Sequence, residues 1–294
     1  MKALIQTCNK QPNQGGLSLV DEPYFLKICG KMLIQYYLDF FYQLGVKEVF
    51  IASNNNEILK QRLLCIDTLN LDIRYIKSSS SKKSYLKNYA SVKEDELIII
   101  ENFGFIKNNL NNIDSSFFKN VGNTQFNNKD FNLIYIKNHC IDVNFKNFKQ
   151  GSILKVKQLQ KFKDYFFISN HIFQNLESKY FLLGYSNNNG IIIGKNVAIE
   201  EGCELIAPII IMDNVKICKN TILGPNTVIN ENAFIEEQCQ IANSIVYDNT
   251  YINKNLKLDY KLISSNIIVD KTDERVYNID EKFVTANSLN LLKF

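Results

Sequence analysis

The sequence predicts an α/β domain with a parallel sheet, followed by a short parallel β-helix. Two observations indicate this: strand-like and helix-like segments alternate in the first part, and a six-residue hydrophobic period begins after residue 190. With 294 residues and 46% hydrophobic content, the chain can bury a substantial core and suggests two domains. We expect domains at 1–185 and 186–262 and a C-terminal tail at 263–294.

The first part alternates strands and helices in order along the chain. Strand-like runs occupy 3–5, 46–52, 71–76 and 97–100; helix-like runs occupy 32–41, ending near Gly45, and a stretch through 57–59 with Ser53 or Asn54 as its cap. This order implies right-handed crossovers and a parallel sheet. Ligands of such sheets bind at the carboxyl ends of the strands, which is where the polar, glycine-ended loop after Ala3-Leu4-Ile5 would lie.

The second part repeats an aliphatic residue every six positions, nine times in succession. Four residues after each of the first eight comes a mostly small or β-branched residue, and we expect both sets to point inward. The aliphatic set is Ile193, Ile199, Leu205, Ile211, Ile217, Leu223, Ile229, Ile235 and Ile241, and the second set is Val197, Cys203, Ile209, Val215, Thr221, Thr227, Ala233 and Cys239.

Pairs such as Lys195-Asn196 and Glu201-Gly202 separate the inward positions, and Asn and Gly tolerate the left-handed backbone of a tight corner. Each hexad is therefore one short strand and one corner. The pattern resembles the hexapeptide-repeat left-handed parallel β-helix, with about three coils over 191–252 and a one-residue slip near Val246 and Ile252. Flat faces and open ends make such a stack a common oligomerisation surface.

Composition excludes several classes of function. The formal charge of +4 includes only three Arg residues, and the lysines are scattered, so we expect no nucleic-acid binding. No apolar run approaches about 18 residues, and the N-terminus lacks a secretory apolar core, so we expect a cytoplasmic protein without membrane segments. Seven cysteines without C-x-x-C spacing argue against a disulfide framework and a zinc site.

The opening of the chain looks like that of the sugar-1-phosphate nucleotidyltransferases, the NDP-sugar pyrophosphorylases. The stretch MKALIQTCNKQPNQGGLSLVDEPYFLKICGKMLIQYYLDFFYQLGVKEVFIAS follows, without a gap, their pattern M-K-A-x-I-L-A-A-G-x-G-T-R-L-x-P-L-T and x-G-K-P-L-I. A β-helix after the catalytic domain is typical of the larger members. The final segment, TYINKNLKLDYKLISSNIIVD followed by DEKFV, resembles a bacterial branch associated with surface-polysaccharide synthesis. The resemblance implies a Rossmann-like nucleotidyltransferase domain.

The matching positions are mostly structural, and the missing ones are mostly chemical. Where the family has loop glycines this chain has Asn9 and Gln11, and the family's phosphate-polarising arginine is Asn13. Phosphoryl transfer depends on positioning and charge neutralisation, so losing that arginine removes a catalytic term. The family's glycine-rich base-contacting segment would fall within 78–85, which contains no glycine.

The metal-binding aspartate of the family falls on Asn102, a poor ligand for Mg²⁺, although Glu101 next to it could supply a carboxylate. These two residues are the metal candidates. The resemblance implies nucleotide-binding candidates at the opening loop and the x-G-K element: Asn9, Lys10, Gly15, Gly16 and Lys31. Lys27 could add positive charge, while a tight turn explains Gly15 and Gly16 equally well. We name no catalytic residue.

Two functions remain open. We favour a catalytically degenerate relative, a pseudoenzyme that binds a nucleotide or nucleotide sugar, or that acts as a regulatory or scaffold subunit. It would form a homo-oligomer, or a hetero-oligomer with an active relative, through the β-helix. The alternative is an active enzyme that joins a nucleoside triphosphate and a sugar 1-phosphate with Mg²⁺, which is the one cofactor implied. A hexapeptide acyltransferase is less favoured, because His139 and His171 both precede the first hexad.

Overall fold

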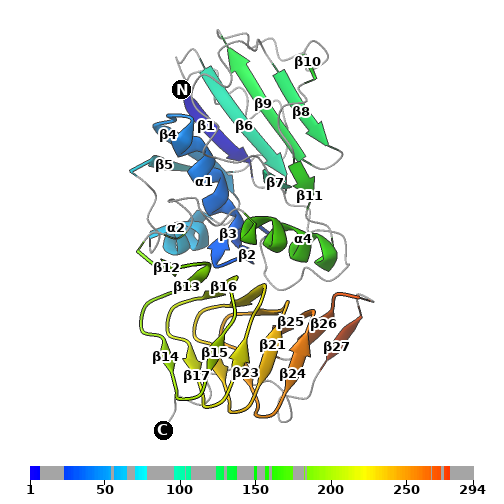
Figure 1. Cartoon of the computed structure of the whole chain (residues 1–294). Coiled ribbons are helices and arrows are strands. Elements are labelled where there is room, and N and C mark those ends of the chain that lie inside the picture. Colours follow the sequence, from blue (N-terminus) through cyan, green and yellow to red (C-terminus); the bar gives the residue numbers. More distant parts are fainter. Residues whose placement is uncertain are drawn as a thin grey trace. The chain divides into compact units, whose positions relative to one another are not determined.

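The structure of the chain is a computed structural model (Figure 1). It describes residues 1–6, 23–53, 56–64, 70–77, 96–102, 104–106, 124–128, 131–137, 149–150, 156–158, 161–174, 182, 184–265, 267–272 and 275–278. Contacts divide the chain into two compact units. Of the described residues, 1–6, 23–26 and 32–158 belong to the first unit, and 27–31 and 161–278 belong to the second.

The first unit contains a mixed sheet in the order β10-β8-β9-β6-β1-β4-β5. β1 pairs in parallel with both β4 and β6, and β4 pairs in parallel with β5. β9 is antiparallel to both β6 and β8. These strands are β1 (Lys2–Gln6), β4 (Glu48–Ser53), β5 (Asp72–Lys77), β6 (Glu96–Asn102), β8 (Thr124–Asn128), β9 (Phe131–Lys137) and β10 (Lys149–Gln150), and a separate antiparallel pair is β7 (Gly104–Ile106) with β11 (Val156–Gln158).

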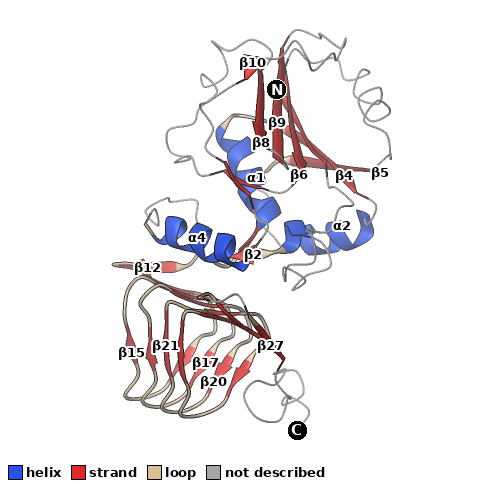
Figure 2. Cartoon of the chain, turned by 90° about the vertical axis from the view of Figure 1, so that its right-hand side faces the viewer, coloured by secondary structure: helices blue, strands red, loops and turns tan. Residues whose placement is uncertain are grey.

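Helix α1 (Leu33–Gln43) lies against one face of this sheet and supplies much of its core (Figures 1 and 2). Its buried side chains include Leu33, Ile34, Phe40 and Phe41. The helix begins where the Gln35 side chain accepts a hydrogen bond from Met32 N at 2.7 Å. The shorter η1 (Pro23–Phe25), β2 (Lys27–Ile28), β3 (Lys31–Met32) and α2 (Asn56–Leu64) complete the described part of residues 23–64.

The predicted order of elements is confirmed over the described residues. Every strand and helix expected before residue 101 is present within a few residues of its predicted bounds. The pattern predicted a parallel sheet, and β5, β4, β1 and β6 are parallel. The strands β9 and β8, joined by antiparallel pairs, and β10, which is parallel to β8, lie beyond the segments that the periodicity had placed.

The second unit contains the predicted β-helix, built of three parallel sheets. Four triplets of strands form successive coils, where about three were expected, and β25 (Lys261–Ser264) starts a fifth. The triplets are β13 (Ile191–Ile193), β14 (Ala198–Ile199), β15 (Glu204–Leu205); β16 (Ile209–Ile211), β17 (Lys216–Ile217), β18 (Ile222–Leu223); β19 (Thr227–Ile229), β20 (Phe234–Ile235), β21 (Gln240–Ala242); and β22 (Ile245–Val246), β23 (Tyr251–Ile252), β24 (Lys257–Asp259).

Both predicted inward sets line the interior of the coils. From the second coil on they form one buried cluster that includes Ile211, Val215, Ile217 and Cys239. In the first coil Ile199 is 40% exposed. The reason is that β14 is the edge strand of its sheet and has a neighbouring coil on one side only.

Asparagines at the corners adopt the left-handed conformation that the sequence predicted, with φ near +55° at Asn196, Asn214, Asn232 and Asn249. Their side chains form a ladder along the coils. Asn196 donates to Asn214 at 2.9 Å, Asn214 to Asn232 at 3.1 Å, and Asn232 to Asn249 at 3.0 Å. Each corner therefore combines a tolerated backbone with a hydrogen bond to the next coil.

The predicted one-residue slip lies at the corner after Ile241. Asn214 and Asn232 are 18 residues apart, whereas Asn226 and its ladder partner Asn243 are 17 apart. The third coil turns this corner with Ala242-Asn243, one residue fewer than Gly224-Pro225-Asn226 in the second coil. The next side-chain bond of the other ladder, Asn232 to Asn249, also spans 17 residues.

The second unit extends beyond the coils at both ends. β12 (Ser186–Asn188) pairs antiparallel with β13, and β26 (Ile267–Asp270) and β27 (Val276–Asn278) continue the same sheet antiparallel beyond β25. Helix α4 (Phe162–Phe173) runs along the β12 side of the coils (Figure 2). Contacts thus place α4 with the β-helix, although the sequence had placed its residues in the domain 1–185. Among the described helices, none is long and apolar enough to span a bilayer.

Candidate functional site

The strand order of the first unit reverses direction at β1. From β1 the chain adds β4 and β5 on one side, and it then returns to add β6 on the other side. In open α/β sheets this is the point where a ligand crevice forms, outside the carboxyl ends of the strands. Gln6 ends β1, Ser53 ends β4, and Glu101 and Asn102 end β6. We call these four strand-end residues the carboxyl edge.

The side-chain oxygen of Gln6 and the side chain of Ser53 are buried at the carboxyl edge. The side-chain oxygen Oε1 of Gln6 is buried and has no hydrogen-bond partner in the described part of the chain. The hydroxyl of Ser53 is 3.4 Å from the hydroxyl of Tyr24, which belongs to η1. A buried acceptor without a donor is unfavourable by about 1–3 kcal/mol, so an unpaired oxygen at this edge calls for an explanation.

The structure brings two of the predicted candidates to this edge. Glu101 stands in register with Gln6 across the β1–β6 pair, and Asn102 is one residue further along β6. The candidates Asn9, Lys10, Gly15 and Gly16 lie outside the described residues, as does the segment 78–85. The metal candidates are therefore placed as strand-end residues.

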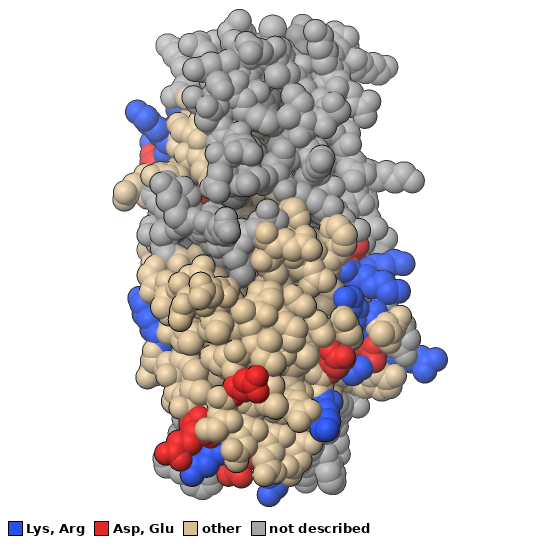
Figure 3. Space-filling view, viewed as in Figure 1, with Lys and Arg blue, Asp and Glu red and all other residues tan. Residues whose placement is uncertain are grey.

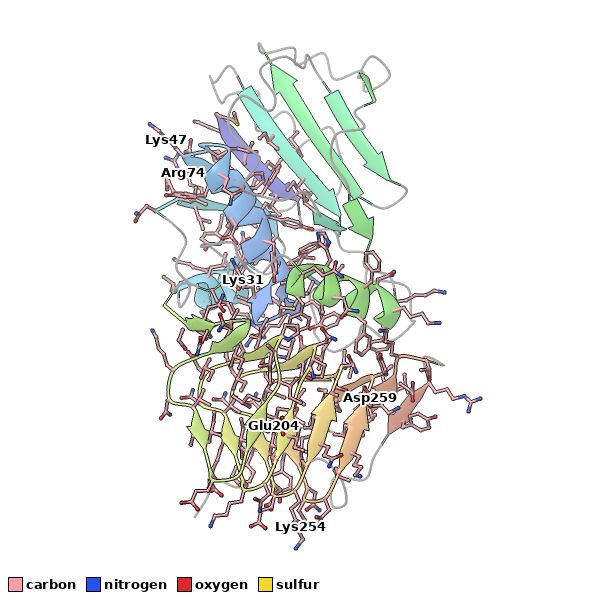
Figure 4. All side chains as sticks on the ribbon, in the orientation of Figure 1. Lys31, Lys47, Arg74, Glu204, Lys254 and Asp259 are labelled. Carbon is pink, nitrogen blue, oxygen red and sulfur yellow. The ribbon has the colours of Figure 1, made fainter. Side chains whose placement is uncertain are left out.

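Lys31 is not brought together with them within one unit. It lies in β3, is 6% exposed, and its contacts assign it to the second unit (Figure 4). Lys27, the other expected source of positive charge, also belongs to the second unit. Its Nζ is 2.9 Å from Asp248 Oδ2 and 3.0 Å from Glu231 Oε2, so carboxylates of the β-helix already neutralise it.

The ion pair changes the titration of its members. Burial alone would lower the pKa of Lys27, but the charges of Asp248 and Glu231 raise it above its usual value. Burial raises the pKa of Asp248, and the nearby Lys27 ammonium opposes that shift. Sequence reasoning missed this arrangement because no local pattern links residue 27 to residue 248.

The ion cluster of the first unit that contains Arg74 lies at the amino ends of the strands, opposite the carboxyl edge. Arg74 contacts Glu48 at 2.7 Å and Asp72 at 3.0 Å, and Lys2 contacts Glu48 at 2.6 Å. Lys2, Glu48 and Asp72 begin β1, β4 and β5, so these charges surround the amino ends of the strands. The label in Figure 4 marks Arg74 there. We assign this cluster a structural role.

The β-helix offers no acyltransferase base within its described coils. His171 lies in α4, outside the coils, and His139 is outside the described residues. Among the described residues no group of three or more potential ligands could hold a metal ion. The described cysteines are the free thiols Cys29, Cys203, Cys218 and Cys239.

Most of the described face of the second unit in Figure 3 is uncharged, and Lys and Arg side chains gather at its right-hand edge beside a few acidic ones. The labels in Figure 4 place Glu204, Lys254 and Asp259 on separate parts of the coils.

Comparison with known proteins identifies relatives of the C-terminal part. The family model described as the GMPPB C-terminal domain matches residues 205–288. This domain is the left-handed β-helix region of sugar nucleotidyltransferases, so the predicted resemblance to that family is confirmed over these residues. No curated protein matches the sequence of this chain.

Solved structures resemble the chain more distantly. HddC from Yersinia pseudotuberculosis, complexed with GMP-PN, is 10% identical with a TM-score of 0.43, covering 56% of this chain and 96% of its own. A UDP-glucose pyrophosphorylase complexed with UDP-glucose is 16% identical with a TM-score of 0.27, covering 34% of this chain and 44% of its own. These scores are too low to support conclusions about the present chain.

Proposed function

We propose that the protein is a relative of the NDP-sugar pyrophosphorylases that binds a nucleotide or nucleotide sugar at the carboxyl edge. The observation that carries the proposal is the unpaired Oε1 of Gln6, which is buried where the strand order reverses. A nucleobase or sugar N–H or O–H group would satisfy this oxygen. The family match of the β-helix supports the same class of ligand.

We further propose that turnover is weak or absent. At the positions that wrap and polarise the triphosphate in the family, this chain carries Asn9, Gln11 and Asn13. None of these supplies positive charge, which phosphoryl transfer needs in its transition state. The protein would then act in surface-polysaccharide synthesis as a cytoplasmic binding, regulatory or scaffold subunit, assembled with copies of itself or with an active relative through the β-helix.

One feature of β6 favours the alternative of an active enzyme, namely the position of the Glu101 carboxylate. Glu101 pairs with Gln6 at the reversal point, one residue before the expected aspartate position. A carboxylate there could hold the Mg²⁺ that bridges the phosphates, provided that the chain accommodates the one-residue shift. The cofactor of the active alternative is therefore Mg²⁺, with Glu101 as its ligand and Asn102 as a weaker one.

Binding and turnover are separated by two measurements on the full chain. Calorimetric titration with nucleoside triphosphates and nucleotide sugars tests binding, and pyrophosphate release from triphosphate and sugar 1-phosphate tests turnover. We expect binding of at least one ligand and no turnover at an ordinary enzyme rate. Ordinary turnover would establish the active alternative, and a Glu101→Gln variant should then abolish it.

The variant Gln6→Leu tests the placement of the ligand. It removes the unpaired oxygen at nearly the same volume and should weaken ligand binding at least about tenfold, which corresponds to the loss of one well-placed hydrogen bond. Gln43→Leu is the matched control. Gln43 also has a buried Oε1 without a partner among the described residues. It ends α1 shortly before the amino end of β4, so it is not one of the residues of the carboxyl edge. Equal effects of both variants would contradict the proposed location.

A further inference from the structure

Strand β5 forms one edge of the sheet in the first unit (Figure 1). It pairs in parallel with β4, and among the described strands β4 is its only partner. An edge strand presents a row of backbone N–H and C=O groups to which another strand can bind. β5 has six residues and contains no proline that would interrupt this row.

Alternate residues of β5 direct their backbone groups to the two sides of the strand. Asp72 N donates to Lys47 O at 2.9 Å, so the backbone groups of Asp72 face β4. By the same alternation the backbone groups of Arg74 also face β4, whereas those of Ile73 and Tyr75 face away from it. The hydrogen-bonding positions of the outer side are therefore Ile73 and Tyr75.

Two side chains of opposite charge stand on one face of β5. The side chains of Asp72 and Arg74 are 58% and 57% exposed, and they contact each other at 3.0 Å. Arg74 also contacts Glu48 Oε1 of β4 at 2.7 Å, and its guanidinium lies 5.9 Å from the ring centroid of Phe50. These contacts hold the two charges in defined positions along the outer strand.

The other face of β5 carries apolar side chains that are only partly covered. Ile73 and Tyr75 are half-buried, and Leu71, just before the strand, is 8% exposed. A strand added along this edge would remove more of Ile73 and Tyr75 from water, which is favourable in proportion to the apolar area buried.

We propose that β5 pairs with β5 of a second copy of the chain, antiparallel about a two-fold axis at Ile73. The two Ile73 residues then exchange both of their backbone hydrogen bonds, and Leu71 of each copy pairs with Tyr75 of the other. Asp72 stands directly opposite Arg74 of the other copy. This is a pair without backbone hydrogen bonds, where opposing side chains come closest.

The charge pattern selects this register. Asp72 neighbours Arg74 along each strand and faces the other copy's Arg74 across the strands, so the four charges alternate in sign around a square. An axis at Asp72 or at Arg74 would place like charges opposite each other, which is destabilising. An axis at Tyr75 would place Arg74 opposite the uncharged Ile76. The exposed pair is therefore complementary to itself only when the axis passes through Ile73.

The predicted interface is small. A single pair of strands buries less area than the roughly 1,200–2,000 Å² of a stable protein interface, so we expect a reversible dimer with a micromolar dissociation constant. Its residues belong neither to the β-helix nor to the carboxyl edge. The inference therefore goes beyond the proposed function and does not depend on it.

Charge variants of the full chain test the pairing by sedimentation velocity over a series of concentrations. Asp72→Arg and Arg74→Asp each place like charges opposite each other twice, so we expect each to weaken self-association at least about tenfold. A one-to-one mixture of these two variants restores opposite charges across the strands and should form a mixed dimer. The double variant Asp72→Arg, Arg74→Asp exchanges the two charges and is the matched control, which should dimerise like the wild type.

Hydrogen exchange of the wild-type backbone amides gives a second measurement that needs no variant. The N–H groups of Ile73 and Tyr75 face the outer side of β5, so their exchange should slow as the protein concentration rises through the dissociation constant. The N–H group of Arg74 faces β4, and its exchange should change much less.

Three results would overturn the proposal. The first is a wild type that remains monomeric throughout the micromolar range. The second is self-association that neither single variant weakens, which would assign it to another surface such as the β-helix. The third is exchange at Ile73 and Tyr75 that does not depend on concentration. Titration with nucleotides requires no second copy, so a failure of the proposed function would be seen separately.

Discussion

Asn232 donates its side-chain N–H to Asn249 at 3.0 Å, across a pair of coils that is one residue closer in sequence than the pair before it. The ladder therefore survives the slip, because the missing residue lies at a different corner, after Ile241. The corner asparagines have two separable roles. They tolerate a left-handed backbone, and they bond to the next coil.

The variants Asn232→Gly and Asn232→Ala separate these roles. Glycine accepts the φ of +58° but loses both ladder bonds, so we expect the free energy of unfolding to fall by about 2 kcal/mol. Alanine should cost about 1 kcal/mol more, because its Cβ disfavours the left-handed region. Urea unfolding measures both. Asn196→Gly, at the end of the ladder, loses only one ladder bond, so the free energy of unfolding should fall by about half as much. Equal decreases at the two sites would contradict the ladder.

Substitution of Gly30 tests the packing of the turn in the β2–β3 hairpin, residues 27–32. Gly30→Ala combines a φ of +84° with an overlap against Sδ and Cε at the flexible end of the buried Met212 side chain, which would have to shift. We expect the variant to reduce the free energy of unfolding by about 2 kcal/mol. Gly45→Ala is the matched control, since Gly45 has φ of +74° but nothing within 4 Å of an added Cβ. It should cost about 1 kcal/mol. Thermal or urea unfolding that ranks the two variants equally would refute the tight packing of the turn.

The described cysteines should differ in reactivity. Burial raises the pKa of the Cys29 thiol to about 12, and burial also raises the pKa values of Cys218 and Cys239. The thiolate is the reactive form, so these three should resist alkylation in the folded protein near neutral pH. Cys203, in the first coil, is partly exposed. Mass spectrometry after a short iodoacetamide pulse should find Cys203 modified before the other three. Early labelling of Cys29 would contradict its burial against Ser169 of α4.

Low pH should weaken the ion pair between Lys261 of β25 and Asp270 of β26. Hydrogen bonds from Lys261 and Thr272 lower the pKa of Asp270 well below its usual value. The folded state therefore binds fewer protons than the unfolded state, and the stabilisation is present above about pH 4 and is lost as pH falls through the folded pKa. Asp270→Asn should lower the free energy of unfolding more at pH 6 than at pH 2.5. An equal effect at both pH values would exclude the ionised contact.

The β-helix could be predicted because each of its rules is local. The six-residue period identified the buried positions, such as Ile211 and Val215, and the corner asparagines. The order of strands before residue 101 followed from alternating periodicity for the same reason. The exception, Ile199, arises because a period says which way a side chain points and not whether another coil covers it.

The contacts of the β2–β3 hairpin could not be predicted from the sequence. Lys27 meets Asp248 only because the fold brings them together, and the sequence around each of them reads as an ordinary polar surface. Likewise, the amphipathic sequence pattern of α4 did not indicate which unit the helix would pack against. Glu101 and Asn102 could be predicted to end a strand because the apolar run 97–100 is followed there by polar residues.

The position of the β2–β3 hairpin in the chain has a consequence for synthesis on the ribosome. The Lys27 N–H donates to the Tyr247 hydroxyl, and these two residues are 220 positions apart, so the hairpin is synthesised long before the fourth coil. The contacts of Lys27 with Tyr247 and Asp248 can therefore form only after the fourth coil has been translated. A nascent chain that stops before residue 245 lacks two of the groups that hold Lys27, and those two contacts form late in synthesis.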